Sequence, residues 1–113
     1  MGRAVAMISD IQTPNDPKTT FNVGTINGGT SVNTISASAN MLIDMRSVSP
    51  VALTELEDQV ITILKKAAEE ENKRWDTDQI QVDIKLVGDT GGFTARRQHH
   101  CSSFPGFCKC TWV

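Results

Sequence analysis

The residues with the clearest potential for chemistry lie close together near the C-terminal end of the chain. They are both histidines and all three cysteines of the sequence, namely His99, His100, Cys101, Cys108 and Cys110. Imidazole nitrogens and thiolates are ligands that zinc prefers, so this cluster is a candidate zinc site. The spacing argues against such a site, since there is no C-x-x-C pair and the two histidines are adjacent. We therefore predict no metal site in this chain, and zinc-dependent peptide hydrolysis by this cluster is the rival hypothesis from the enzyme class.

The charge distribution separates this segment from the rest of the chain. Residues 1–89 hold all 13 acidic residues but only 8 of the 11 basic ones, which gives a net charge of −5. Residues 90–113 carry a net charge of +3, because their three basic residues have no acidic counterpart. We predict that residues 1–89 are one domain fragment. We expect residues 90–113 to be an atypical tail, disordered or non-native, as a shifted reading frame would produce.

Length and composition exclude several classes of function. A chain of 113 residues suits one domain rather than two. The acidic body argues against a nucleic-acid partner, because phosphate contacts need clustered lysines and arginines. There is no apolar run of about 18 residues that would span a membrane. We therefore expect a cytoplasmic protein without a nucleic-acid or membrane partner.

An alternation of apolar and polar residues predicts a long strand in the first half of the chain. Every odd position within Thr34–Arg46 is apolar, and the even positions are polar apart from Leu42. Because side chains on a strand point alternately to its two faces, this pattern predicts a half-buried strand. Residues 19–26 are rich in β-branched side chains and predict a preceding strand. Asn27–Thr30, with two glycines, favours a turn between them, so we expect an antiparallel hairpin.

Two helices and a further strand complete the predicted elements. Apolar residues at spacing three predict a short helix over residues 2–12. Ser49 as N-cap and Pro50 at the first position predict a helix that runs to about Arg74 with one apolar stripe. Residues 80–86 alternate again and predict a strand. One-sided strands with two amphipathic helices predict an α+β fold: an incomplete ferredoxin-like two-layer sandwich, lacking its first strand, with an antiparallel sheet and both helices on one face.

The predicted hairpin carries a specific set of residues at fixed spacing. They are Gly28 and Gly29 at the turn, Asn33 after three further residues, and Asp44 and Arg46 at the end of the second strand. This pattern resembles the lid, or dimerisation, domain of the zinc metallopeptidase family that contains acetylornithine deacetylase, succinyl-diaminopimelate desuccinylase, glutamate carboxypeptidase and peptidase T. The resemblance extends over residues 1–89. The family usually has a proline two or three residues after the asparagine, and this sequence does not.

The resemblance implies roles for four of these residues. In the family, the residues that match Asn33 and Arg46 hold a substrate carboxylate, in many members across a dimer interface. A guanidinium can bind a carboxylate through two parallel hydrogen bonds, which suits this role. We take Asn33, Arg46, Gly28 and Gly29 as candidate substrate-binding residues. The structural alternative is that the glycines and Asn33 only shape a turn and that Arg46 only pairs with Asp44.

The resemblance also implies what this chain lacks. The family's catalytic domain holds two zinc ions through His, Asp and Glu, and zinc is therefore a cofactor of that missing domain rather than of this chain. Residues 1–89 contain no histidine, and a hydrolytic zinc site needs about three protein ligands and an open position for water. We predict a non-catalytic lid that forms a homodimer through a sheet edge or helix and closes over substrate on the parent enzyme's catalytic domain. The alternative is a free-standing ferredoxin-like module that binds a small carboxylate or amino acid through Asn33 and Arg46.

Overall fold

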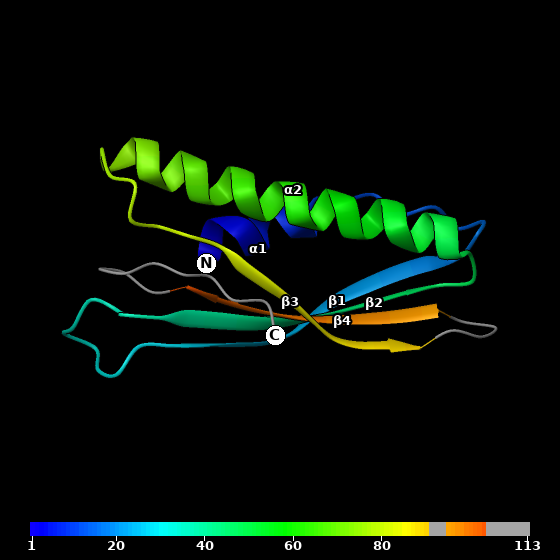
Figure 1. Cartoon of the computed structure of the whole chain (residues 1–113), viewed down its shortest axis with the longest axis horizontal. Coiled ribbons are helices and arrows are strands. Elements are labelled where there is room, and N and C mark those ends of the chain that lie inside the picture. Colours follow the sequence, from blue (N-terminus) through cyan, green and yellow to red (C-terminus); the bar gives the residue numbers. More distant parts are fainter. Residues whose placement is uncertain (91–94, 104–113) are drawn as a thin grey trace.

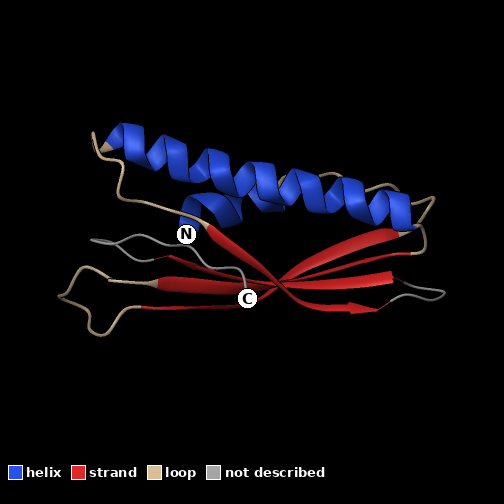
Figure 2. Ribbon diagram, in the orientation of Figure 1, coloured by secondary structure: helices blue, strands red, loops and turns tan. Residues whose placement is uncertain are grey.

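Two helices cover one face of a four-stranded sheet in the computed structural model, which describes residues 1–90 and 95–103 (Figure 1). In chain order the elements are α1 (Gly2–Ser9), β1 (Thr19–Gly28), β2 (Ala39–Ser47), α2 (Pro50–Arg74), β3 (Asp83–Thr90) and β4 (Ala95–Ser103). The strands lie in the order β1-β2-β4-β3, and every neighbouring pair is antiparallel. Figure 2 shows the helix layer above the twisted, open sheet. The predicted α+β class, with an antiparallel sheet and both helices on one face, is confirmed.

The long helix α2 begins and ends where the sequence predicted. The Ser49 side chain accepts a hydrogen bond from the backbone N–H of Ala52 at 3.4 Å, and Pro50 is the first helical residue. The apolar stripe of α2 packs against the helix-facing side of β2 and against α1. The buried core consists of Ala4, Ile8, Met41, Ile43, Met45, Leu53, Leu56, Val60, Leu64 and Ala67. None of the helices in the described part of the chain is long and apolar enough to cross a membrane.

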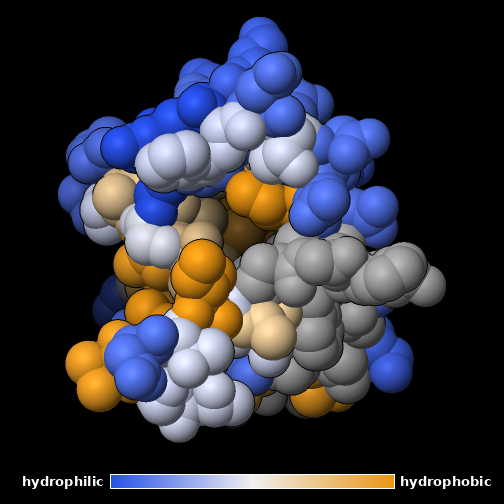
Figure 3. Space-filling model, turned by 90° about the vertical axis from the view of Figure 1, so that its left-hand side faces the viewer, coloured by the Kyte–Doolittle hydropathy of each residue, from blue (hydrophilic) through white to orange (hydrophobic). Residues whose placement is uncertain are grey.

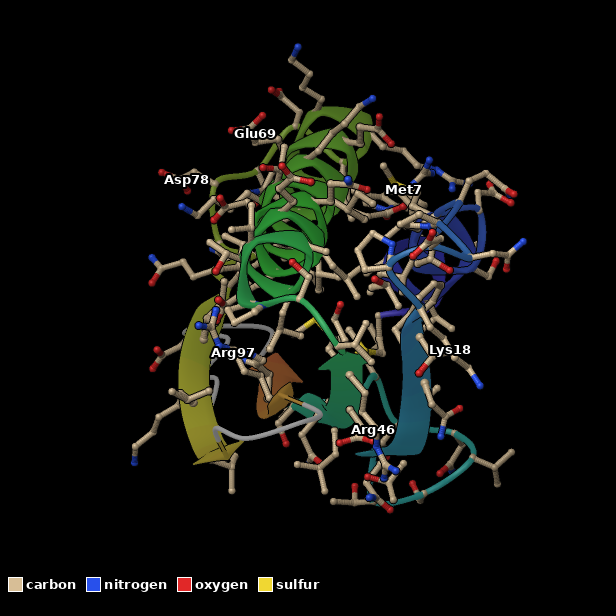
Figure 4. All side chains as sticks on the ribbon, turned by 90° about the vertical axis from the view of Figure 1, so that its right-hand side faces the viewer. Met7, Lys18, Arg46, Glu69, Asp78 and Arg97 are labelled. Carbon is tan, nitrogen blue, oxygen red and sulfur yellow. The ribbon has the colours of Figure 1, made fainter. Side chains whose placement is uncertain are left out.

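The short helix α1 lies beside α2, over the β1 side of the sheet (Figure 4). Its buried residues Ala4 and Ile8 join the core. Arg3 connects it to the last turns of α2, with Nε 2.6 Å from a Glu71 carboxylate oxygen and Nη1 3.2 Å from Glu70. The hydrogen bond from Arg3 lowers the pKa of the Glu71 carboxyl below its ordinary value. Because these groups are exposed to solvent, the pairs orient α1 without adding much stability.

The loop between the two strands of the hairpin is longer than the sequence predicted. The expected strand over Thr34–Arg46 begins only at Ala39, and residues 29–38 form a loop. Strand β1 ends at Gly28, which lies opposite Ala39, so residues 34–38 have no strand of this hairpin beside them. Ile35, which the alternation placed on the buried face, is 89% exposed. Alternation alone therefore set the start of the strand five residues too early.

The third strand also differs from its predicted bounds of residues 80–86. The backbone N–H and C=O of Ile80 both bond to the side-chain amide of Asn72, each at 3.0 Å. The segment is therefore tied to the end of α2 at this point. Strand pairing starts at Asp83, and β3 continues to Thr90. The side chain of Asn72 thus bonds the backbone groups of Ile80 that would otherwise pair with a neighbouring strand.

Strand β4 was not predicted, because the sequence placed this segment in the atypical tail. Ala95–Ser103 lies between β2 and β3 and pairs with both. A complete ferredoxin-like unit has a strand before α1 that runs parallel to β1, with one strand between them. Strand β4 has this position and this direction. The remaining tail residues, 91–94 and 104–113, lie outside the described residues, and so do the predictions made for them.

Candidate functional site

The two glycines of the predicted signature are required by the backbone of the hairpin. A Cβ atom on Gly28 would lie 2.7 Å from the carbonyl oxygen of Ser38 and 2.9 Å from the Cα of Ala39, which is closer than such atoms approach. Gly29 has a φ of +87°, a conformation that other residues rarely adopt. The structural interpretation of this pair is thus supported directly. A contact of these glycines with substrate stays a prediction.

Replacing Gly28 with alanine is expected to lower the free energy of unfolding by about 1–3 kcal/mol, because the backbone atoms opposite it must move apart. Gly24 is the matched control in the same strand. Its Cβ would meet the Asn22 side chain at 3.6 Å, an ordinary contact. Gly24→Ala should therefore leave stability unchanged or raise it by about 0.4–1 kcal/mol. Urea denaturation followed by circular dichroism compares the two, and an equal loss in both variants would contradict the close approach at Gly28.

Asn33 lies in the exposed loop between β1 and β2. Its side-chain oxygen accepts a hydrogen bond of 2.8 Å from the hydroxyl of Ser31, which also contacts the hydroxyl of Thr34 at 2.7 Å. Val32 and Ile35 are exposed in the same loop. Figure 3 views the molecule from this end and shows apolar side chains between the hydrophilic helix layer and the hairpin. The loop therefore presents both an amide and apolar side chains to solvent.

Arg46 lies at the opposite end of the hairpin, on the face of the sheet that the helices leave open (Figure 4). Its Nε is 2.8 Å from a carboxylate oxygen of Asp44, and half of its side chain is exposed. Nearby, a shallow hollow of about 390 Å³ opens on this face. The hollow is lined by Asn22, Gly24, Thr25, Leu42, Ile43, Asp44, Arg46 and Val87. A small acidic group in this hollow would meet the guanidinium beside an apolar floor.

The structure does not bring Asn33 and Arg46 together within one chain. Strand β2 starts at Ala39 next to the loop, and Arg46 follows seven residues later. At a rise of about 3.3 Å per residue, this places Arg46 roughly 23 Å beyond the start of the strand. A single carboxylate therefore cannot contact both side chains of the same chain.

A polar cluster beneath α2 is the feature that the sequence did not predict. Glu57 of α2 forms an ion pair with Arg97 of β4, and its other carboxylate oxygen lies 3.0 Å from Nε2 of His99. The ring of His99 is buried, with 3% of the residue exposed, and Arg97 also reaches the hydroxyl of Thr54 at 3.5 Å. One signal was present in the sequence. Glu57 falls inside the apolar stripe, four residues after Leu53 on the same helix face.

The described residues do not fit a metal site. Across residues 1–90 and the described side chains of β4, no group of three or more His, Cys, Asp or Glu side chains could hold a metal ion. Glu57 and His99 are a pair, and a zinc site needs at least three protein ligands. The side chains of His100 and Cys101, like Cys108 and Cys110, lie outside the described residues.

The fold and the hairpin agree with a comparison against known families. The family model described as the peptidase dimerisation domain, of the M20 peptidases, matches residues 1–72. The chain belongs to this peptidase dimerisation domain family. The match covers α1, the whole hairpin and nearly all of α2, and it ends before β3 and β4. M20 peptidases depend on metal ions, and the residues described in this dimerisation domain do not assemble a site for one. No curated protein matches the chain.

Proposed function

We propose that this chain is the self-associating lid of a metal-dependent peptidase or N-acyl amino acid hydrolase and is not catalytic by itself. The observation that carries the proposal is the family match over the two-layer fold, together with an open sheet edge suited to pairing. The metal and its ligands belong to the catalytic domain of the parent enzyme. The lid would supply self-association and part of the substrate contacts.

Strand β1 is the edge that we assign to the dimer. Its ten residues include no charged side chain, and among residues 1–90 and 95–103 only β2 pairs with it, which leaves one row of its backbone N–H and C=O groups without a strand of the described chain beside it. The other edge, β3, carries Asp83, Lys85 and Asp89. Charged residues on an edge strand oppose pairing with another chain, whereas a long uncharged edge favours it. We therefore infer that two copies pair β1 with β1 in an antiparallel manner.

This pairing would bring Arg46 of one copy near Asn33 of the other copy. Arg46 lies opposite Thr20, near the start of β1, whereas the loop with Asn33 follows the end of β1 at Gly28. Antiparallel pairing about a two-fold axis places the start of one β1 beside the end of the other. Arg46 of one copy then faces the Asn33 loop of the second copy across two strand spacings, about 10 Å. A substrate carboxylate between them would receive a bidentate guanidinium contact and an amide donor.

The alternative is a free-standing module that binds a carboxylate within one chain. The separation of Asn33 from Arg46 along β2 argues against it. The same separation is expected of a site that is completed across a two-fold axis. The dimeric lid is therefore the function that the geometry supports better.

Adding a charge to the β1 edge is expected to separate the dimer. Ile26 on β1 and Val87 on β3 are each 52% exposed, which makes them a matched pair. In sedimentation velocity, the native chain and Val87→Lys should sediment as dimers. Ile26→Lys should weaken association by at least about tenfold, equivalent to about 1.4 kcal/mol. A native chain that is monomeric at high micromolar concentration would refute the dimer, and equal weakening by both substitutions would refute the assignment to β1.

A further inference from the structure

Strand β1 changes face at its centre. Side chains of directly opposed residues in an antiparallel pair lie on the same face of the sheet. In the first half of β1 the odd-numbered residues lie on the helix face, since Phe21 is opposite the buried Met45. The register with β2 shifts by one residue at Gly24, so in the second half it is Ile26 that lies opposite the buried Met41. The helix face of β1 therefore carries Thr19, Phe21, Val23, Ile26 and Gly28, and its open face carries Thr20, Asn22, Thr25 and Asn27.

This change of face limits how two copies of β1 can pair about a two-fold axis. If the axis passes through a residue, odd-numbered residues meet odd-numbered ones. Pairing across the centre of the strand would then set helix-face side chains opposite open-face ones, so only equal halves could pair. If the axis passes between two residues, odd meets even, and the first half of one copy matches the second half of the other. The longest register of this kind has the axis between Val23 and Gly24 and includes all ten residues of β1.

The side chains that this register brings together are complementary. On the helix face, Phe21 of one copy lies opposite Ile26 of the other. Phe21 packs against the core of its own chain and is partly buried, whereas Ile26 is 52% exposed. An aromatic ring opposite a β-branched side chain is a favourable cross-strand pair, and the two-fold axis repeats it. On the open face each pair joins an asparagine to a threonine, namely Asn22 with Thr25 and Thr20 with Asn27.

The bulge at Gly24 lies on the two-fold axis in this register. A bulge on an edge strand commonly hinders pairing, because it twists the strand and leaves one residue outside the ladder. Between two copies, the bulges would face each other at the centre, where Gly24 contributes no side chain. Regular pairing can then continue on both sides of the axis. The bulge therefore selects one register rather than preventing association.

We propose that two copies of the chain associate in this register, with the axis between Val23 and Gly24. Phe21 of each copy covers Ile26 of the other, so the apolar layer beneath the helices continues from one copy into the next. Both helix layers then lie on the same side of the combined sheet. This inference rests on the self-association through β1 proposed above and adds which residues meet.

The register also sets where the Asn33 loop begins relative to Arg46. Asn27 of the second copy lies opposite Thr20, whose neighbour on β2 is Arg46. The loop of the second copy starts after Gly28, only one residue further along. The register therefore starts this loop beside the end of β2 that carries Arg46.

Disulfide formation between single-cysteine variants tests the register. In a full chain whose cysteines are replaced by serine (Cys101, Cys108 and Cys110), Asn22→Cys and Thr25→Cys are made separately at two exposed positions. Opposed residues of an antiparallel pair have Cα atoms about 4.5–5.5 Å apart, which a disulfide can bridge. The two variants are mixed, equilibrated under reducing conditions and then mildly oxidised. The mixture should form at least about tenfold more covalent dimer than either variant alone, with the mass of the mixed species.

Each single variant reports an alternative register. In the proposed register, the two copies of Cys in an Asn22→Cys dimer are three residues apart along the strand, roughly 10 Å, which is too far for a disulfide. Asn22→Cys would cross-link to itself if the axis passed through that residue, and the same holds for Thr25→Cys. Preferential self-cross-linking of either variant would overturn the register. Absence of the mixed cross-link would overturn it as well.

Sedimentation velocity of the reduced variants separates this result from a failure of the proposed function. Variants that sediment as monomers would contradict both the dimer and its register. Variants that sediment as dimers without forming the mixed cross-link would contradict the register alone. Circular dichroism confirms that each variant is folded.

A second pair of variants tests the outer part of the strand. Thr20→Cys and Asn27→Cys, in the same serine background, should also cross-link as a mixture and not separately. Both positions are exposed. Cross-linking in only one of the two mixtures would show that the pairing does not extend along the whole of β1 and would overturn the proposal.

Discussion

Glu57→Gln is expected to lower the free energy of unfolding by about 3 kcal/mol. Removing one partner of a buried ion pair costs about 3–5 kcal/mol, because it leaves the other charge buried without compensation. The Glu57 and Arg97 side chains keep 18% and 22% of their exposure, which places the effect toward the lower end of that range. Glutamine preserves the size of the side chain and can still bond to one neighbour. The loss in the free energy of unfolding therefore measures the contribution of the Glu57 charge rather than that of its packing.

Glu55 is the control for this measurement. It lies two residues earlier on α2 and is exposed to solvent. Glu55→Gln should change stability by no more than about 0.5 kcal/mol, as surface substitutions usually do. Urea denaturation of both variants gives the comparison. A loss of similar size in the two variants would mean that the cluster beneath α2 contributes nothing beyond the general charge of the helix.

The elements that depend on local chemistry could be predicted from the sequence. Helix α2 has an N-cap at Ser49, proline at its first position and an apolar stripe, and its observed bounds, Pro50–Arg74, agree with the prediction. The start of β2 could not be predicted in this way. Ile35 continues the alternation, yet β1 has already ended at Gly28, so no strand of the hairpin lies beside it. Alternation describes which face a residue prefers, whereas the length of a strand is set by its partner.

Strand β4 could not be predicted because its position is set by residues far away in the sequence. The segment shows no alternation of apolar and polar residues, because Arg97 and His99 on the helix face are as polar as Arg96 and Gln98 beside them in the sequence. Arg97 and His99 are accommodated by Glu57, about 40 residues earlier in the chain. The only local signal was an acidic residue within an apolar stripe. Such a residue indicates that something basic packs beneath the helix, but it does not identify the partner.

For the candidate substrate residues, too, the sequence predicted the residue types but not how the fold places them. The sequence identified Gly28, Gly29, Asn33 and Arg46 by type and spacing, and the structure explains the glycines by the backbone they must form. The sequence alone could not show that Asn33 and Arg46 lie at opposite ends of one hairpin. That separation depends on the length of the loop, which runs over residues 29–38 instead of forming a tight turn. Only with the separation known does a site shared between two copies become the better explanation.

Ile43→Ala should be the most destabilising single truncation in the hairpin, with an expected loss of about 2–5 kcal/mol. Ile43 is 1% exposed and lies between Val23 of β1 and His99 of β4, beneath the helix layer. Truncation leaves a cavity at the centre of the sheet that the neighbouring strands cannot fill without breaking their register. Truncating an aliphatic side chain on the open face should cost much less.

Leu42 provides the comparison, because it is adjacent to Ile43 and points to the other face with 38% of the residue exposed. Leu42→Ala should cost less than about 1 kcal/mol, since the side chain is already partly in water. Both variants are measured by urea denaturation, with an unchanged denaturant dependence as the sign that only stability has altered. A slip of β2 by one residue would exchange the two faces. A larger loss at Leu42 than at Ile43 would therefore show that the register of the central hairpin, and with it the open face assigned to Arg46, is inverted.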